Sequence, residues 1–165
     1  MLREYKTTDR DVCIDVFKSN VPEYFREHEL NDFLNFLDTL AFPYFVILEQ
    51  NEVVACGGYA LRDDSKCADL CWGMVRHQLH SKNYGKMLLM FRLKSIASFE
   101  HITAVRLGTS QLTKGFFQKY GFLNFGTQPN GIAPGLDDVE MRMELTPDVR
   151  SEILDKWDVM VEDRG

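Results

Sequence analysis

The chain has 165 residues, a length that fits one domain, and its 45% hydrophobic and 27% charged residues are typical of a globular protein. The formal net charge of −6 argues against a nucleic-acid partner, whose phosphates need a basic surface, and weakly favours a cationic partner. The sequence has no apolar leader and no run of about 18 apolar residues, so we expect a cytoplasmic protein without a membrane partner.

Apolar periodicity and turn residues predict alternating strands and helices. In the first half of the chain we expect a strand at 2–6, helices at 11–18 and 29–40, and strands at 44–49, 53–61 and 67–75. Pro22 separates the two helices, because proline lacks an N–H and restricts the residue before it. Turns at Gln50-Asn51 and at 62–65 make the last three strands an antiparallel meander.

In the second half of the chain we expect a polar loop at 76–83, a helix at 84–99, a strand at 102–108, a short helix at 112–120, and strands at 122–127 and 139–145. Pro129, Gly131 and Pro134 predict a loop over 128–136. The residues from Pro147 onward can form a terminal helix. This order predicts one mixed α/β domain over 1–146, with 147–165 packed on it or extending from it.

The loop before the helix at 84–99 has the composition of an anion site. Ser81, Asn83 and Gly85 are small or tolerate a positive φ, and Lys82 and Lys86 are basic. At a helix start, unpaired N–H groups and the helix dipole attract anions. An ordinary capped helix with solvated lysines explains the same residues, so both interpretations stay open.

Gly73 interrupts the apolar strand at 67–75. A glycine at such a place often marks a β-bulge or the close approach of a ligand. A bulge at Gly73-Met74 frees backbone groups with which a ligand can pair as an extra strand does. One loop before an anion site, this pattern predicts a long ligand with an anionic end and an amide-containing arm.

Two short runs carry a family resemblance. Residues 80–85 read His-Ser-Lys-Asn-Tyr-Gly, and residues 116–122 read Phe-Phe-Gln-Lys-Tyr-Gly-Phe. Both are similar to motifs of the GNAT N-acetyltransferase superfamily. These motifs are Gln/Arg-x-x-Gly-x-Gly/Ala in the cofactor loop and aromatic-aromatic-x-Lys-x-Gly-Phe, in which the short helix ends. In the first run only Gly85 matches strictly, since His80 replaces Gln or Arg and Asn83 replaces Gly. The order of elements fits the family from Leu2 to Leu145.

The resemblance implies an α/β (α+β) GNAT fold, with a mixed, mostly antiparallel sheet of about six or seven strands and about four helices. Residues 1–146 are then the acetyltransferase domain, and acetyl-CoA is the cofactor. Backbone N–H groups of 81–86 would bind the pyrophosphate, and the backbone of Met74 and Val75 would pair with the pantetheine arm. The implied cofactor residues are Met74, Val75, His80, Ser81, Lys82, Asn83, Tyr84, Gly85, Lys86, Ser110, Phe116, Phe117 and Lys119.

Acetyl transfer requires a base for the amine and a proton for the leaving thiolate. Asp69 is the candidate base or substrate anchor, because several family members carry a catalytic carboxylate on this strand; a solvated carboxylate is the alternative. The family's usual acid is a tyrosine at the place of Phe117, which has no proton to donate. Tyr120 is a candidate substitute, but its position three residues further on is more typical of a packing aromatic. Ser110 or water is the other candidate acid.

The family's acceptor pocket forms between the first two helices and the central strands. The candidate residues there are Glu23, Tyr24, Phe25, Tyr59 and Trp72. Aromatic rings with a carboxylate suit a cation that has an apolar body, although each residue can equally belong to the core. The four histidines form no cluster with ligand spacing, so we expect no metal.

These observations favour an N-acetyltransferase that acts on a primary amine of a small molecule or peptide, as a monomer or homodimer. A coenzyme-A-binding module with weak or no catalysis is the alternative, because Phe117 and the altered cofactor loop depart from the family pattern. An interaction domain that has lost the cofactor is the third possibility.

Overall fold

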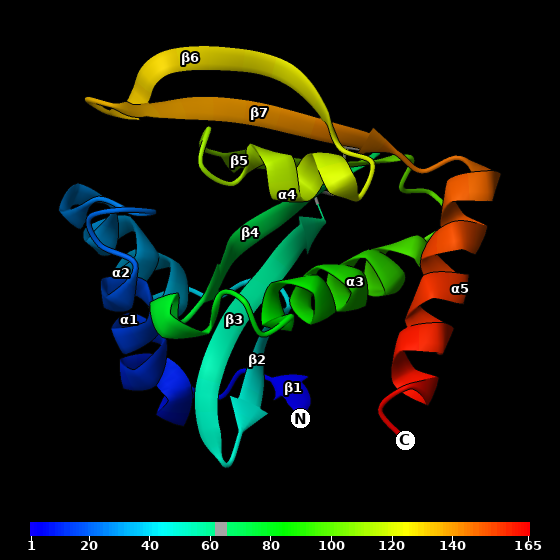
Figure 1. Ribbon diagram of the computed structural model, residues 1–165, viewed down its shortest axis with the longest axis horizontal. Helices are drawn as coiled ribbons and strands as arrows, with labels where there is room; N and C mark the ends of the chain where they lie inside the picture. The colour runs from blue at the N-terminus through cyan, green and yellow to red at the C-terminus, as the bar shows by residue number, and fades with distance from the viewer. Residues whose placement is uncertain (62–65) are drawn as a thin grey trace.

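The computed structural model describes residues 1–61 and 66–165, and the turn predicted at 62–65 lies outside the described residues. Seven strands form one sheet in the order β1-β2-β3-β4-β5-β7-β6 (Figure 1). The strands are β1 (Leu2–Glu4), β2 (Tyr44–Glu49), β3 (Glu52–Leu61), β4 (Cys67–Val75), β5 (Ala104–Thr109), β6 (Leu123–Ala133) and β7 (Leu136–Glu144). Only the β4–β5 pair is parallel, which confirms the predicted mixed, mostly antiparallel sheet.

Helices cover both faces of the central strands (Figure 1). They are α1 (Arg10–Ser19), α2 (Leu30–Asp38), α3 (Tyr84–Ala97), α4 (Lys114–Lys119) and α5 (Pro147–Glu162). Successive residues of a strand point to opposite faces of its sheet, and β2 follows this rule. Val46 packs in a cluster with residues of α1 and α2, whereas Ile47 packs with Leu88 of α3. The sheet is therefore buried on both sides, as the continuous apolar run of β2 indicates.

The parallel strands β4 and β5 diverge along their length. They pair only at Cys67–Ala104, Ala68–Val105 and Asp69–Arg106. Beyond Asp69, β4 continues to Val75 and pairs with β3 alone, while β5 pairs with β7. The edge of β4 that faces β5 consequently lacks a strand partner from Leu70 onward.

The hairpin of β6 and β7 is longer than the sequence predicts. The loop expected over 128–136 is wrong, because β6 runs to Ala133 and only a short turn at Pro134 and Gly135 separates the two strands. Pro129 is tolerated in β6 because this is the outer strand of the sheet, so one side needs no ladder donor. The register is also irregular between Gln128 and Ala133.

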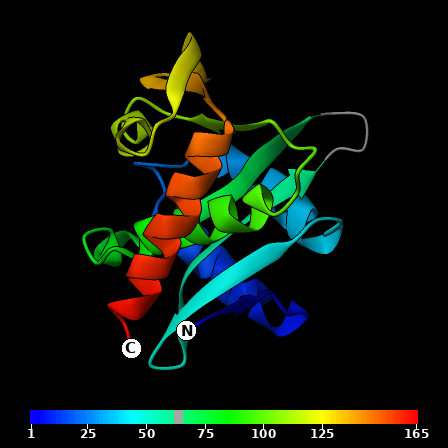
Figure 2. The ribbon, with the colours of Figure 1, turned by 90° about the vertical axis from the view of Figure 1, so that its right-hand side faces the viewer.

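The C-terminal helix α5 lies beside α3 (Figure 2). Ile153 is buried there, and Arg150 donates to the carbonyls of Ala97, at 2.8 Å, and Phe99, at 3.4 Å. This contact attaches the last helix to the end of α3 and to the loop before β5. Within the described residues, we find no helix that combines the length and the apolar character needed to span a bilayer.

Candidate active site

A β-bulge interrupts β4 beside the point where β5 diverges. Cys56 of β3 pairs with Met74 and Gly58 pairs with Cys71, so that Trp72 and Gly73 both lie opposite Gly57. Trp72 has a φ of 45°, in the left-handed region. The bulge thus begins one residue earlier than the predicted Gly73-Met74. It breaks the alternation of side chains along β4, which matters for every residue counted across it.

The start of α3 lies just after this strand. Asn83 is the residue before the helix and has a φ of 66°, the left-handed conformation that its side chain was expected to permit. The backbone N–H of Lys82 already donates to Leu79 O at 3.1 Å, so it is not available in the way predicted for the run 81–86. The first turn of α3 still presents its N–H groups, with the positive end of the helix dipole, at this edge.

One cavity of about 600 Å³ extends from the start of α3 along the gap between β4 and β5. Its walls come from β4, β5, α3, α4, the α1–α2 loop (20–29) and β6. A side chain on Gly85 would project between Val75 and Phe116, at 3.8 and 3.6 Å from them, so glycine keeps this part of the cavity open. The cavity, the open edge of β4 and the helix start fit a long ligand with an anionic end.

The structure brings part of the predicted site to this cavity. The predicted residues that line it are Tyr24, Phe25, Trp72, Met74, Val75, His80, Gly85, Ser110, Phe116 and Phe117. The predicted residues that do not line it are Glu23, Tyr59, Asp69, Ser81, Lys82, Asn83, Tyr84, Lys86, Lys119 and Tyr120. Among these residues, Ser81 to Tyr84 and Lys86 lie at the start of α3. The remaining five residues belong to other elements.

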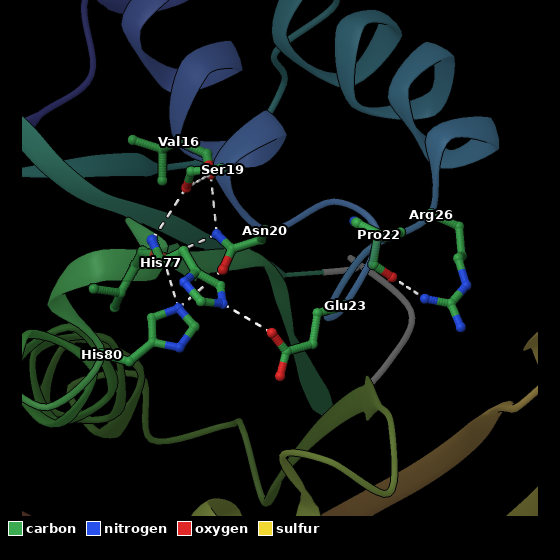
Figure 3. Close-up of polar contacts among 9 residues, drawn as sticks. Val16, Ser19, Asn20, Pro22, Glu23, Arg26, His77 and His80 are labelled. Carbon is green, nitrogen blue, oxygen red and sulfur yellow. Dashed lines mark hydrogen bonds and ion pairs between the residues drawn. The ribbon is translucent and has the colours of Figure 1, made fainter.

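His80 lies at the junction of the cofactor loop, α1 and β4 (Figure 3). Its Nε2 is 2.9 Å from Asn20 Oδ1 and 3.0 Å from Val75 O. The Asn20 amide is oriented because its Nδ2 donates to Val16 O at 3.0 Å and to Val75 O at 2.9 Å. Both neighbours of His80 Nε2 are therefore acceptors, which assigns the hydrogen to Nε2 and leaves Nδ1 as an acceptor in the neutral ring. Burial lowers the pKa of His80 and favours this neutral form.

A second polar contact holds the α1–α2 loop against the cofactor loop. Glu23 Oε2 is 2.9 Å from His77 Nε2 (Figure 3). The ring of Tyr24 packs near both histidines, with centroids 5.7 Å from His77 and 4.8 Å from His80. The predicted acceptor residue Glu23 thus serves here as a link between two loops, and Tyr24 forms the adjoining cavity wall.

Another part of the cavity wall is aromatic. Trp72 lies 6.3 Å from Phe25 and 5.1 Å from Phe33 between ring centroids. Glu29 also lines the cavity, and its Oε2 accepts a hydrogen bond from the backbone N–H of Arg26 at 2.7 Å. Ile132 of β6 closes the wall from the hairpin side. An apolar surface with one carboxylate is the environment expected for an amine with an apolar body.

Asp69 lies outside the main cavity. It belongs to the segment where β4 still pairs with β5, and its Oδ1 accepts from Arg106 Nε at 3.0 Å. Both residues line a second, smaller cavity with Asp138 and Glu140. The bulge explains the displacement, because counting by twos from Asp69 no longer places its side chain on the face of Gly73.

The two remaining tyrosine candidates are packed against apolar neighbours. Tyr59 is 5% exposed and lies against Phe45 on the face that α3 covers, away from the predicted acceptor pocket. Tyr120 packs on Phe116, with ring centroids 5.1 Å apart, and burial raises the pKa of its hydroxyl. Phe117 lines the cavity where the family pattern places a tyrosine, so no hydroxyl is present at that position.

Sequence reasoning missed several residues of the cavity wall, notably Asn20, Glu29, Leu88 and Arg92. Arg92 is the most unusual, because it is only 4% exposed. It lies among the buried residues Leu88, Leu89, Leu93 and Ile96 of α3. A charged residue at an apolar position of a helix was the available signal.

Solved structures share the fold at low sequence identity. The chain resembles a GNAT-family acetyltransferase from Desulfovibrio desulfuricans at 16% identity and a TM-score of 0.75, covering 88% of this chain and 99% of that one. An aminoglycoside 6′-N-acetyltransferase complexed with coenzyme A is similar at 16% identity and a TM-score of 0.72. The match covers 89% of this chain and 98% of that one. The ribosomal-protein-S18-alanine N-acetyltransferase from Escherichia coli is similar at 12% identity and a TM-score of 0.73. The match covers 88% of this chain and 94% of that one. No curated protein matches the sequence significantly.

The family model described as "Acetyltransferase (GNAT) domain" matches residues 20–145. Fold, cavity and this match together define an acyltransferase that uses acetyl-CoA as its donor. The chain belongs to the GNAT acetyltransferase family.

Proposed function

We propose that this enzyme transfers an acetyl group from acetyl-CoA to a primary amine by direct attack within a ternary complex. The observation that carries the proposal is one continuous cavity of about 600 Å³, whose walls include both the bulged edge of β4 and the aromatic α1–α2 loop. A donor held at one wall and an amine held at the other can meet without leaving the protein. We expect the enzyme to act in the cytoplasm, as a monomer or homodimer.

The donor wall consists mainly of backbone. The open edge of β4 at Met74 and Val75 can pair with the amide arm, and the N–H groups at the start of α3 can hold the pyrophosphate. Asn83 supports this arrangement by adopting the left-handed turn that the family usually builds with glycine. Phe116 adds an apolar wall opposite Gly85. Bound acetyl-CoA supplies an acyl group already activated as a thioester.

The proton of the amine is the next requirement. We assign its removal to His80, directly or through water, because Nδ1 of its neutral ring is an acceptor and the residue lines the cavity. Asp69, the earlier candidate, is held by Arg106 beside a different cavity. His80→Gln is therefore expected to lower kcat about 100-fold, while Asp69→Asn changes it much less. The reverse order of effects would return the role to Asp69.

The acceptor is proposed to be a small molecule or peptide whose amine is attached to an apolar body. Tyr24, Phe25 and Trp72 supply aromatic faces, and Glu29 supplies a carboxylate. Two of the similar structures are an aminoglycoside 6′-N-acetyltransferase and a ribosomal-protein-S18-alanine N-acetyltransferase. An acceptor panel should therefore include aminoglycosides, polyamines, lysine peptides and peptides with a free N-terminus.

Thiol release from acetyl-CoA with this panel tests the proposal. Double-reciprocal plots that intersect are expected for a ternary complex. Parallel plots would instead indicate an acyl-enzyme, for which Cys71 in the cavity wall is one candidate nucleophile. No thiol release with any acceptor would count against catalysis.

A coenzyme-A-binding module is the second candidate function, favoured by the missing hydroxyl at Phe117. Calorimetry separates the two functions. Tight binding of coenzyme A without turnover on the full panel would identify a binding module, whereas an interaction domain would bind no coenzyme A.

A further inference from the structure

Arg92 is a buried cation, and no acidic side chain of residues 1–61 and 66–165 forms an ion pair with it. It donates from Nε to Leu88 O at 3.2 Å and from Nη1 to Gly58 O at 3.3 Å. Burial lowers the pKa of Arg92 to about 10, which still leaves it cationic at neutral pH. Two backbone carbonyls compensate only part of a buried charge, so the remaining positive potential acts on the cavity.

Two glycines make room for this guanidinium at the bulge. A Cβ on Gly73 would lie 2.8 Å from Arg92 Nη2, and a Cβ on Gly57 would lie 3.3 Å from Nη1. The chain therefore lacks side chains on both strands where Arg92 approaches them. Nη2 takes part in no hydrogen bond found among the described residues. Arg92 is one of the residues that line the cavity.

We propose that Arg92 is a catalytic residue, whose charge stabilises the thioester of the acetyl donor as it reacts, in the absence of a hydroxyl at Phe117. The inference rests on the proposed acetyl transfer. The position of Arg92 supports this role, because its guanidinium lies against the bulged segment of β4, next to the backbone proposed to hold the donor.

The charge balance of the reaction explains why a cation suits this place. The amine nitrogen forms a bond to the carbonyl carbon, and the π electrons of the carbonyl move to its oxygen. The carbonyl then re-forms as the C–S bond breaks, and the electron pair of that bond leaves on sulfur as a thiolate. The proton of the nitrogen passes to His80, directly or through water. Negative charge thus develops on oxygen and then on sulfur. A fixed guanidinium stabilises both without donating its proton.

The kinetic test compares Arg92→Met, which removes the charge at similar length, with Arg92→Lys, which keeps it. We expect Arg92→Met to lower kcat about 100-fold with little change in KM for acetyl-CoA, and Arg92→Lys to recover much of the loss. Lys94→Met is the matched control, because it removes a charge from the same helix beside Trp157, outside the cavity. Equal losses in both Arg92 variants would overturn the assignment, since they would show a purely structural role.

A second measurement needs no acceptor. Carbon-13 NMR of bound acetyl-CoA labelled at the carbonyl reports how strongly that bond is polarised. We expect a downfield shift on binding to the wild type and to Lys94→Met, and a smaller shift with Arg92→Met. If Arg92→Met does not fold, Gly73→Ala replaces it, because the added Cβ displaces the guanidinium. A carbonyl shift in Arg92→Met, or in Gly73→Ala where it replaces that variant, equal to the shift in the wild type would overturn the proposal.

Different results would refute acetyl transfer and the role of Arg92. If the wild type releases no thiol with any acceptor, the proposed acetyl transfer is refuted and Arg92 loses its role with it. If the wild type turns over and Arg92→Met keeps the same kcat and carbonyl shift, only the assignment of Arg92 is refuted.

Discussion

His80 gives this chain a titratable ring where the family's cofactor loop usually carries Gln or Arg. The ring bridges α1 and the end of β4 through Asn20 and Val75 (Figure 3). Asn20 Oδ1 and Val75 O both accept from Nε2, so the neutral ring already supplies the hydrogen that these two oxygens need. A second proton would go to Nδ1 and would add a charge close to His77, which also acts to lower the pKa of His80.

This arrangement predicts a pH-dependent contribution to stability. The pKa of His80 in the folded protein is below its usual 6.5, so the unfolded chain binds more protons in the interval between the two values. The neutral ring contributes fully to the free energy of unfolding above pH 6.5. This contribution is lost as the pH falls through the pKa of His80 in the folded protein. The free energy of unfolding, measured with urea, should therefore fall more steeply in this interval for the wild type than for His80→Gln.

Glutamine is the informative substitution because its amide can still donate to Val75 O but does not titrate. The same change at His101, outside the cavity, controls for the loss of a histidine as such. Parallel stability curves for the wild type and His80→Gln would contradict the assigned protonation state.

At the scale of elements, the contact between β3 and the segment before β2 depends on Gly58. A Cβ at this position would collide with the carbonyl oxygen of Pro43 and lie 2.8 Å from the ring of Tyr44. Backbone cannot move aside as a flexible side chain does. We expect Gly58→Ala to destabilise the protein by about 3 kcal/mol in chemical denaturation.

Gly126→Ala is the control, because an added Cβ there meets no atom within 4 Å. It should change the free energy of unfolding by less than about 0.5 kcal/mol. Similar effects at both positions would show that the close approach at Gly58 relaxes without cost.

The regular elements were predictable where local pattern and tertiary structure agree. The bounds of β4 at Cys67–Val75 match the prediction, and Gln50 and Asn51 form the expected turn with φ values of 50° and 66°. The extent of β6 was not predictable from its own residues. Pro129 and Gly131 usually indicate a loop, and only the position of β6 at the edge of the sheet permits them.

The parts of the site that consist of backbone were predictable from local sequence. The parts that depend on contacts between side chains far apart in the chain were less predictable. The left-handed Asn83 and the open cavity at Gly85 follow from local sequence. The pairing of Asp69 with Arg106 depends on the register between two strands that are far apart in the chain. The place of Arg92 depends on glycines in two other strands, which periodicity within α3 cannot reveal.

At the scale of the whole molecule, α5 belongs to the same packed unit as the sheet. Ile153 is 5% exposed within the main core, whereas its neighbour Leu154 is 43% exposed. We expect Ile153→Ala to lower the free energy of unfolding by about 2–4 kcal/mol, and Leu154→Ala to have little effect. One cooperative thermal transition that shifts as a unit would show that residues 147–165 stabilise the domain. A separate early transition in Ile153→Ala would instead identify α5 as an independent appendage.

The short parallel contact between β4 and β5 also has a consequence for the life of the protein in a cell. Only three residue pairs connect these strands, and the sheet reaches β7 and β6 through that contact. A donor that pairs with the open edge of β4 supplies bonds that the polypeptide lacks. At 100 times its dissociation constant such a ligand adds about 2.7 kcal/mol of stability. Proteolytic susceptibility, and therefore the abundance of the enzyme, is then expected to follow the supply of acyl donor.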